Sequence, residues 1–145
     1  VLHGTPFFTA DERAERLSRG HKPLTIEADG SHFKQIWDTL TNISLNEASL
    51  EITNWTVLLH FLAGEKEWFG HNAVYNYDME PAIRALAMPV CIISNRGDMV
   101  HPSDKRVIET RPDFLYREME EAGTYQVVYD RPEAWANLVA EFVKH

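Results

Sequence analysis

One acidic side chain stands where an α/β protein would place catalytic chemistry. Asp98 follows the apolar run "PVCIIS", which is typical of a strand buried on both faces of a parallel sheet. In open α/β sheets the functional groups gather at the carboxyl ends of such strands. An aspartate there can orient a histidine and stabilise its cation. It can also simply cap the turn "NRGD", because Gly-Asp is common turn chemistry, and both roles stay open.

The aromatic residues of the first half offer a second candidate site. Trp37 and Trp55 fit helical apolar stripes and are therefore expected in a core. Trp68 and Phe69 lie next to Gly70 and fit such a stripe less well. We expect these two rings to line an apolar substrate pocket, because ligand pockets are lined mainly by apolar and aromatic side chains.

Other reactive residue types are present without a recognisable pattern. No HxH or HExxH spacing occurs among the histidines, so no metal site is expected, and without a glycine-rich phosphate loop no nucleotide cofactor is expected. Ser31 opens a helix after a loop, and either Ser31 or Asp29 is expected to cap that helix, so Ser31 is predicted to be a helix N-cap rather than a nucleophile. The histidines are His3, His21, His32, His60, His71, His101 and His145.

The second half of the chain must position Asp98, and its pattern predicts strand, helix, strand, helix. The strand "PVCIIS" is followed by a short helix, "PSDKRVIET", and by a second strand in "DFLYREM". In "DRPE", Asp130 is predicted to cap a final helix whose first turn holds Pro132. This order is typical of an α/β layer architecture.

The first half predicts helices almost throughout, after two residues that read as the tail of a strand. Thr9 and Glu12 form a capping box, and the helix that they start ends at Gly20. Phe33, Ile36, Trp37 and Leu40 mark a second helix, and a third ends at Gly64 with a stripe of Ala48, Ile52, Trp55, Leu59 and Leu62. A weaker helix follows in "EKEWFGHNAVYNY", and Asp78 is predicted to cap a short one.

Composition limits the classes of partner. The chain has 145 residues with 14 basic and 22 acidic side chains, a net charge of -8, which disfavours nucleic acid and anionic membranes as partners. No apolar stretch approaches the length of a membrane span, and the start has no signal-peptide pattern. The single cysteine, Cys91, is expected to be a buried, unpaired thiol, compatible with a reducing compartment and a cytoplasmic location.

Two segments, "LAMPVCIISNRGDMVHPSD" and "AGTYQVVYDRPEAWANLVAEFVKH", resemble the C-terminal portion of α/β-hydrolase-fold enzymes. The stretch "DGSHFKQIW" and its neighbouring helices resemble the lid that this family inserts before its last strands. The resemblance spans the chain and is strongest over residues 86–143. It implies three parts: the end of a core strand and loop (1–8), a helical lid (9–87) and a C-terminal α/β core segment (88–145). It also implies that Asp98 is the acid of a catalytic triad.

The residue at the expected position of the family's histidine is a tyrosine. That histidine stands seven residues before the proline of the final helix, which from Pro132 leads to Tyr125. A phenol with a pKa of about 10 is a poor base for a serine hydroxyl. Three interpretations stay open: a catalytically silent relative, a substituted variant, or another histidine such as His101 acting as base. Tyr125 can equally be an aromatic wall residue.

The family's nucleophile motif, G-x-S-x-G, does not occur in this chain, and neither do the early strands of its sheet. Two strands do not make a stable parallel sheet, so we expect a separate N-terminal chain to supply the nucleophile and complete a heterodimer. The resemblance then implies a serine hydrolase or esterase acting on a small ester, lactone, thioester or amide with apolar bulk. The isolated chain is expected to be inactive. The alternative is a catalytically silent binding protein with the same fold.

Overall fold

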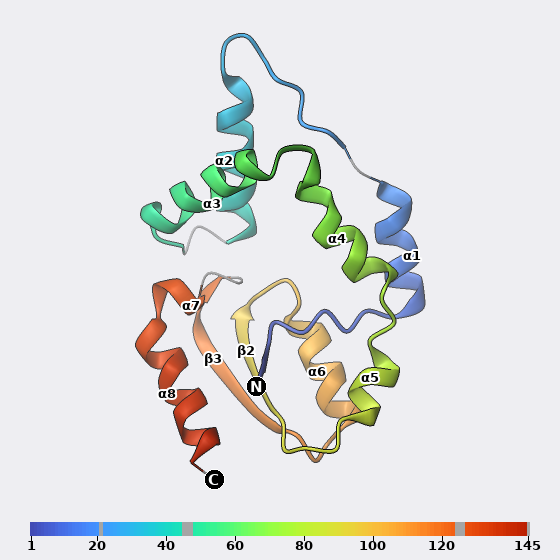
Figure 1. Cartoon of the computed structure of the whole chain (residues 1–145). Helices are drawn as coiled ribbons and strands as arrows, with labels where there is room; N and C mark the ends of the chain where they lie inside the picture. The colour runs from blue at the N-terminus through green and yellow to red at the C-terminus, as the bar shows by residue number, and fades with distance from the viewer. Residues whose placement is uncertain (21, 45–47, 124–126, 145) are drawn as a thin grey trace.

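The molecule is a mixed α/β protein built on a three-stranded parallel sheet (Figure 1). The computed structural model describes residues 1–20, 22–44, 48–123 and 127–144, and only the backbone of 120–123. The strands lie in the order β1-β2-β3, which confirms the α/β class and both expected strands of the second half. Their bounds are Leu2–His3 for β1, Cys91–Gly97 for β2 and Leu115–Gly123 for β3.

The first and second strands are neighbours although a long helical insertion separates them in the chain. Leu2 pairs with Ile92, while residues 4–90 leave the sheet and return to it. The start of the chain therefore does form a strand, Leu2–His3, as the sequence predicts. The insertion holds α1 (Ala10–Arg19), α2 (Ser31–Ile43), α3 (Leu50–Ala63), the 3-10 turn η1 (Gly64–Lys66), α4 (Glu67–Asn76) and α5 (Glu80–Ala85). Figure 1 shows α2 and α3 beyond the carboxyl ends of β2 and β3.

Helices cover both faces of the sheet, so β2 is buried on both sides. On one face Ile92 packs with Ile83 of α5 and Val107 of α6 (His101–Thr110). On the other face Ile93 packs with Val127 of α7 (Val127–Asp130), and α8 (Pro132–Val143) adds partly buried residues. The expected burial of Cys91 is confirmed, since its side chain is inaccessible and desolvation raises the pKa of its thiol.

The capping box at the start of α1 is confirmed. The Thr9 hydroxyl accepts from the Glu12 amide at 3.2 Å, and the Glu12 carboxylate accepts from the Thr9 amide at 2.7 Å. The predicted helix ends at Gly20 and Gly64 are also confirmed, both with positive φ. These local signals were readable because each involves residues within one turn of helix.

Other caps differ from the prediction. Ser31 is the first residue of α2, and its amide donates to Asp29 Oδ1 at 3.0 Å, while Gly30 is the N-cap. Asp130 does not cap α8, because it ends the short helix α7 and accepts from the Ser49 amide at 3.2 Å instead. Arg131 is the N-cap of α8. The side chain of Asp130 thus makes a long-range hydrogen bond in place of the cap that the local pattern predicts.

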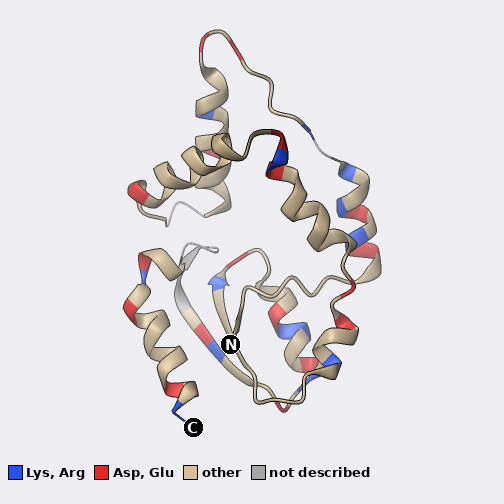
Figure 2. Cartoon of the chain, viewed as in Figure 1, with Lys and Arg blue, Asp and Glu red and all other residues tan. Residues whose placement is uncertain are grey.

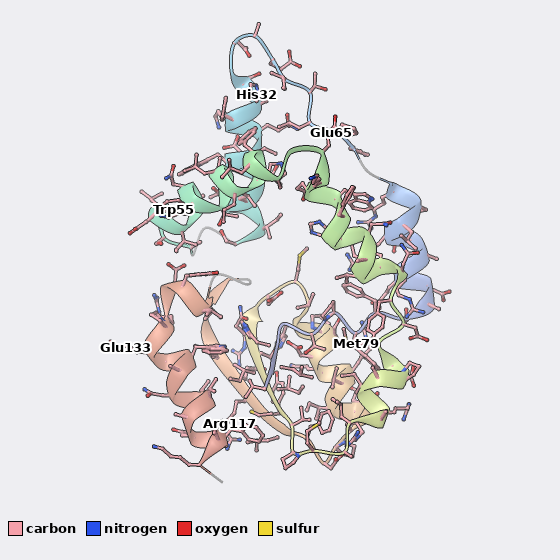
Figure 3. The ribbon with its side chains drawn as sticks, in the orientation of Figure 1. His32, Trp55, Glu65, Met79, Arg117 and Glu133 are labelled. Atoms are coloured by element: carbon pink, nitrogen blue, oxygen red, sulfur yellow. The ribbon has the colours of Figure 1, made fainter. Side chains whose placement is uncertain are left out.

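The buried face of α3 is not the predicted stripe. Thr53 and Val57 are buried, and Phe61 stacks on Phe33 of α2 with ring centroids 4.5 Å apart. Trp55 is 57% exposed and Leu62 is 82% exposed, so the expected core role of Trp55 is wrong (Figure 3). The reason is that α3 is apolar on nearly all sides, so periodicity cannot say which face is covered. A helix of this kind is typical of burial within a larger assembly.

Among the helices that the structure describes, none has the length and apolar character needed to cross a membrane.

A single arginine fixes the end of the insertion to the sheet. Arg111 follows α6, and its Nη1 donates to the carbonyls of Ile83 and Leu86 at 2.9 Å and of Arg84 at 3.1 Å. These carbonyls belong to the last turn of α5 and its C-cap, where helix carbonyls need partners from outside the helix; Ile83 accepts in addition from the Leu86 amide at 3.4 Å. The guanidinium also pairs with Asp113, which raises the pKa of Arg111 and lowers that of Asp113.

We expect Arg111→Met to lower the melting temperature clearly more than Arg84→Met does. Arg84 makes an exposed i,i+4 pair with Glu80, and such pairs contribute little, whereas Arg111 satisfies carbonyls of a helix end. Thermal unfolding followed by circular dichroism measures both variants. Equal melting temperatures for the two variants would contradict the role of Arg111.

Candidate functional site

The carboxyl end of β2 turns sharply at Asp98. The Asp98 amide donates to the Asn95 carbonyl at 3.0 Å, and the Asp98 carbonyl accepts from the His101 amide at 3.0 Å. The carboxylate takes part too, because its Oδ1 accepts from the Val100 amide at 2.9 Å. Asp98 therefore does cap the turn, through one of its two carboxylate oxygens.

The second oxygen of Asp98 has a different environment. Within the described residues, Oδ2 accepts no hydrogen bond. It lies against Gly4, where an added Cβ would be 3.4 Å away at a φ of +60°, so only glycine fits without strain. The side chain is 8% exposed. A carboxylate held by one oxygen, with the other unoccupied, has the arrangement that an orienting acid requires, so turn capping and the acid role are compatible.

A buried carboxylate lies beside this turn. Asp104 of α6 is fully buried; its Oδ1 accepts from the Thr5 amide at 2.7 Å and its Oδ2 from the Ser94 hydroxyl at 2.5 Å. Desolvation raises the pKa of Asp104, and the hydrogen bonds from Ser94 and Thr5 oppose that rise. The carboxylate joins the loop after β1, the strand β2 and the helix α6 at one point.

The ring of His101 connects this carboxylate site to the third strand. Its Nδ1 lies 3.0 Å from Ser94 Oγ and its Nε2 lies 3.5 Å from Glu118 Oε2. Since the Ser94 proton points to Asp104, Nδ1 must be the donor to Ser94. The imidazole of His101 is thus bound to Ser94 and Glu118. Among the described residues, the hydrogen bond between His101 and Asp98 comes from the His101 backbone amide and not from the ring.

Glu118 closes the network on β3. It accepts from the Tyr116 hydroxyl at 2.8 Å and from Arg96 at 2.9 Å, and these donors lower its pKa. Burial and the bond to Glu118 raise the pKa of Tyr116 to about 12. Ser94 and Glu118 are register partners in the parallel pair, so the strands themselves bring them together.

Sequence reasoning missed this network, although weak signals exist. Tyr116 and Glu118 are two apart on a strand, and His101 and Asp104 are three apart on a helix, so each pair shares a face. The decisive contact joins Thr5 to Asp104, which are 99 residues apart. No local pattern indicates that pairing.

The arrangement restricts the chemistry available to the described residues. Ser94 is fully buried and donates to Asp104, so it is not placed as a nucleophile. Ser94, His101 and Glu118 do lie in series, but the Ser94 proton goes to Asp104, and within residues 1–20, 22–44, 48–123 and 127–144 no histidine ring is hydrogen-bonded to the Asp98 carboxylate. Tyr125 lies outside the described residues. Among the described residues, Gly123 at the end of β3 pairs with Gly97, the residue before Asp98.

The predicted pocket residues differ in their surroundings. Trp68 lines a hollow between α1 and α4, whereas Phe69 is 65% exposed and is not part of that lining. Sequence reasoning had not foreseen that arginines of α1 would form the opposite wall. Over the described residues, no group of three or more His, Cys, Asp or Glu side chains is placed to hold a metal ion.

We expect Asp104→Asn to change how stability depends on pH. The native pKa of Asp104 is raised, so its contribution to stability is full below the ordinary value of 3.8 and is lost as pH rises through the native value. The free energy of unfolding of the variant should therefore gain on that of the wild type as pH rises. Urea unfolding from about pH 3.5 to pH 7 measures this difference.

The variant Asp113→Asn is the control of opposite sign. The pKa of Asp113 is lowered, so its contribution is present above the ordinary value and is lost as pH falls through the native value. A parallel pH profile for Asp104→Asn and the wild type would show that the Asp104 carboxylate titrates alike in both states.

No model of a known protein family matches the sequence, and no curated protein is similar to it. The functional conclusion therefore depends on the geometry of the strand ends.

Proposed function

We propose that this chain is the lid-containing C-terminal segment of an α/β-hydrolase-like serine hydrolase. Its substrate is a small ester, lactone, thioester or amide with apolar bulk, and a separate N-terminal chain supplies the serine nucleophile. The observation that carries the proposal is Asp98, which ends the central strand with one carboxylate oxygen fixed and the other unoccupied among the described residues.

The topology supports this proposal. The acid follows the middle strand of a parallel sheet, a helix leads to the next strand, and a final helix packs back on the sheet. The helical insertion leaves from the end of β1 and returns to its neighbour β2, which suits a lid placed over the carboxyl ends of the strands (Figure 1). Ligands of open α/β sheets bind at that end.

Two surfaces support the need for a further chain. The strand β1 has only two residues, and in the described part of the chain its outer edge pairs with no strand. Sheets of so few strands are marginal alone. The helix α3 also presents Trp55, Leu59 and Leu62 to solvent, each more than half exposed. We take the occupant to be the N-terminal chain that carries the earlier strands and the nucleophile.

In this proposal each group has one role. The serine of the partner chain attacks the carbonyl carbon and forms an acyl-enzyme, while backbone amides of that chain stabilise the oxyanion. Asp98 Oδ2 accepts from the group that takes the serine proton. The resemblance puts that base at position 125. A phenol is a poor base at neutral pH, so the serine proton is transferred slowly and we expect low turnover in the unsubstituted assembly.

The alternative is a catalytically silent binding protein that keeps the fold. One observation favours it: the described histidine and serine at this strand end, His101 and Ser94, bind each other and two carboxylates rather than Asp98. In that case the pocket holds a ligand without turnover.

The test begins with the intact mass of every chain in the purified protein, which identifies the partner. In that assembly we expect Tyr125→His to raise hydrolysis of 4-nitrophenyl acetate strongly, because an imidazole titrates near neutrality and can take the serine proton. Adding Asp98→Asn should remove most of the gain, by about a factor of 10⁴ where a complete triad operates. Initial rates from the release of 4-nitrophenolate measure both effects.

Two matched variants serve as controls. Tyr129→His introduces the same ring at a residue that is 67% exposed, and Asp113→Asn removes an exposed carboxylate. Neither should alter the rate. If Tyr125→His gives no gain in a folded assembly, position 125 is only a wall residue. The hydrolase proposal fails, and the binding protein remains, if the unsubstituted assembly also shows no hydrolysis that depends on Asp98. A gain that survives Asp98→Asn would remove Asp98 from the mechanism.

A further inference from the structure

The helices α1 and α4 face each other across a hollow of about 370 Å³. Neither helix contributes a buried residue, so their contact is not an apolar core. Its volume falls within the range of small-molecule sites. The lining consists of basic residues from α1 and the segment after it, with aromatic residues and one acid from α4: Arg16, Arg19, Gly20, Lys22, Glu67, Trp68, His71 and Tyr75.

Two aromatic rings hold Arg16 in this hollow, and the charge of Glu12, whose pKa Arg16 helps to lower, lies near it. Its guanidinium carbon lies 4.2 Å from the ring centroid of Phe8 and 5.7 Å from that of Tyr75. Its Nε is buried and has no hydrogen-bond partner within the described residues. The acid one turn before it, Glu12, binds Arg106 at 2.8 Å and the Thr9 amide at 2.7 Å. Nε is enclosed by protein atoms, so only the terminal Nη groups of Arg16, which likewise have no acceptor among the described residues, can meet a ligand in the hollow.

The charge around the hollow is positive although the protein carries a net charge of -8. Basic and acidic residues are interspersed along α1 (Figure 2), and the two that line the hollow, Arg16 and Arg19, are both basic. With Lys22 from the segment after α1, they face the single lining acid Glu67. Arg19 pairs at 2.5 Å with Glu15, and Glu15 is not a lining residue of the hollow. Two histidines lie near the Glu67 carboxylate: Nδ1 of His71 is 3.4 Å and Nδ1 of His60 is 4.0 Å from Glu67 Oε1. Glu67 also lines the hollow and repels negative charge. We therefore expect the hollow to hold a singly charged anion better than a dianion.

Aromatic rings form the wall opposite the arginines. Trp68 stacks on His71 with ring centroids 6.0 Å apart and an interplanar angle of 25°. Tyr75 lies 5.7 Å from Trp68, and these three residues share one face of α4. Such a wall favours a flat ring, because stacked and edge-on contacts add to the burial of apolar area.

We infer that this hollow is a binding site for an aromatic monocarboxylate. The ring lies against Trp68 and Tyr75, and the carboxylate accepts from Arg16, with Arg19 adding to the local positive charge. A planar guanidinium matches a carboxylate with two parallel donors, which explains an arginine rather than a lysine beside the rings. This site does not depend on the hydrolase proposal, since none of its lining residues belongs to the Asp98 strand end.

The direct test is a calorimetric titration of the purified protein, in its native assembly, with 2-naphthoate and with its neutral isostere 2-naphthamide. We expect saturable binding of the naphthoate, weaker binding of the amide by about tenfold or more, and weaker naphthoate binding as salt is raised. Inorganic phosphate is titrated as the competing source of an anion, and it should bind less tightly than the naphthoate.

Variants separate a ligand site from a packing contact. Arg16→Gln should weaken naphthoate binding by about tenfold or more, and Arg16→Lys should restore part of it. Arg19→Gln should weaken it by about two- to fivefold, because its charge is already paired. Arg84→Gln is the matched control, since it breaks a similar exposed i,i+4 pair outside the hollow and should change nothing. Circular dichroism checks that each variant folds. If Arg16→Gln does not fold, the naphthoate affinity of Arg19→Gln decides whether the site exists.

The same titration in Asp98→Asn separates this inference from the proposed function. Binding of 2-naphthoate should be unchanged in that variant, whatever happens to ester hydrolysis. Equal affinity for naphthoate and naphthamide, tighter binding of phosphate, or no loss on Arg16→Gln and Arg19→Gln in folded protein would each overturn the inference. Absence of saturable binding would do the same and would leave Arg16 the role of holding α1 against α4.

Discussion

The buried carboxylate of Asp104 is the constraint on which the functional end of the sheet depends. It accepts from the Thr5 amide and the Ser94 hydroxyl, and through Ser94 and His101 it connects to Glu118 on the third strand. The loop after β1 and the middle parts of β2 and β3 are thereby tied to α6. Apolar residues of similar volume can often replace a buried polar group without loss of stability. A buried polar network instead specifies one arrangement of the strands and helices around it, because each polar group is satisfied only when its hydrogen-bond partners are in place.

The other parts of the insertion are attached at separate points around this end. Arg106 of α6 donates to the Phe7 carbonyl and to Glu12, and so fixes the start of α1. Arg111 holds the last turn of α5 at the opposite end of α6. Both arginines stem from α6 or the residue after it, so this helix organises the insertion as well as the sheet. The helices α2 and α3 pack mainly on each other, and α3 keeps an apolar face in solvent.

Sequence patterns predicted what depends on neighbouring residues and failed where distant residues decide. The capping box of Thr9 and the buried strand around Cys91 were readable, because each follows from a few adjacent side chains. The face of α3 that holds Trp55 was assigned wrongly, since an apolar helix offers several stripes of equal quality. Asp130 does not form its expected cap, because its carboxylate accepts from the distant Ser49 amide instead. The pairing of the Asp104 carboxylate with Thr5 gave no local signal, because the two residues are 99 apart in the sequence.

The two candidate sites have opposite electrostatic character, and this limits what each can do. Three carboxylates, those of Asp98, Asp104 and Glu118, lie around the end of β2, so this region favours a cation such as a protonated imidazole. The hollow at Arg16 favours an anion. A carboxylate ligand is therefore attracted to α1 and repelled from the strand end, where a negative group would compete with the carboxylates for donors. Separation of the two charges on different elements allows an acid to stabilise a cation at Asp98 while α1 and α4 hold an anion.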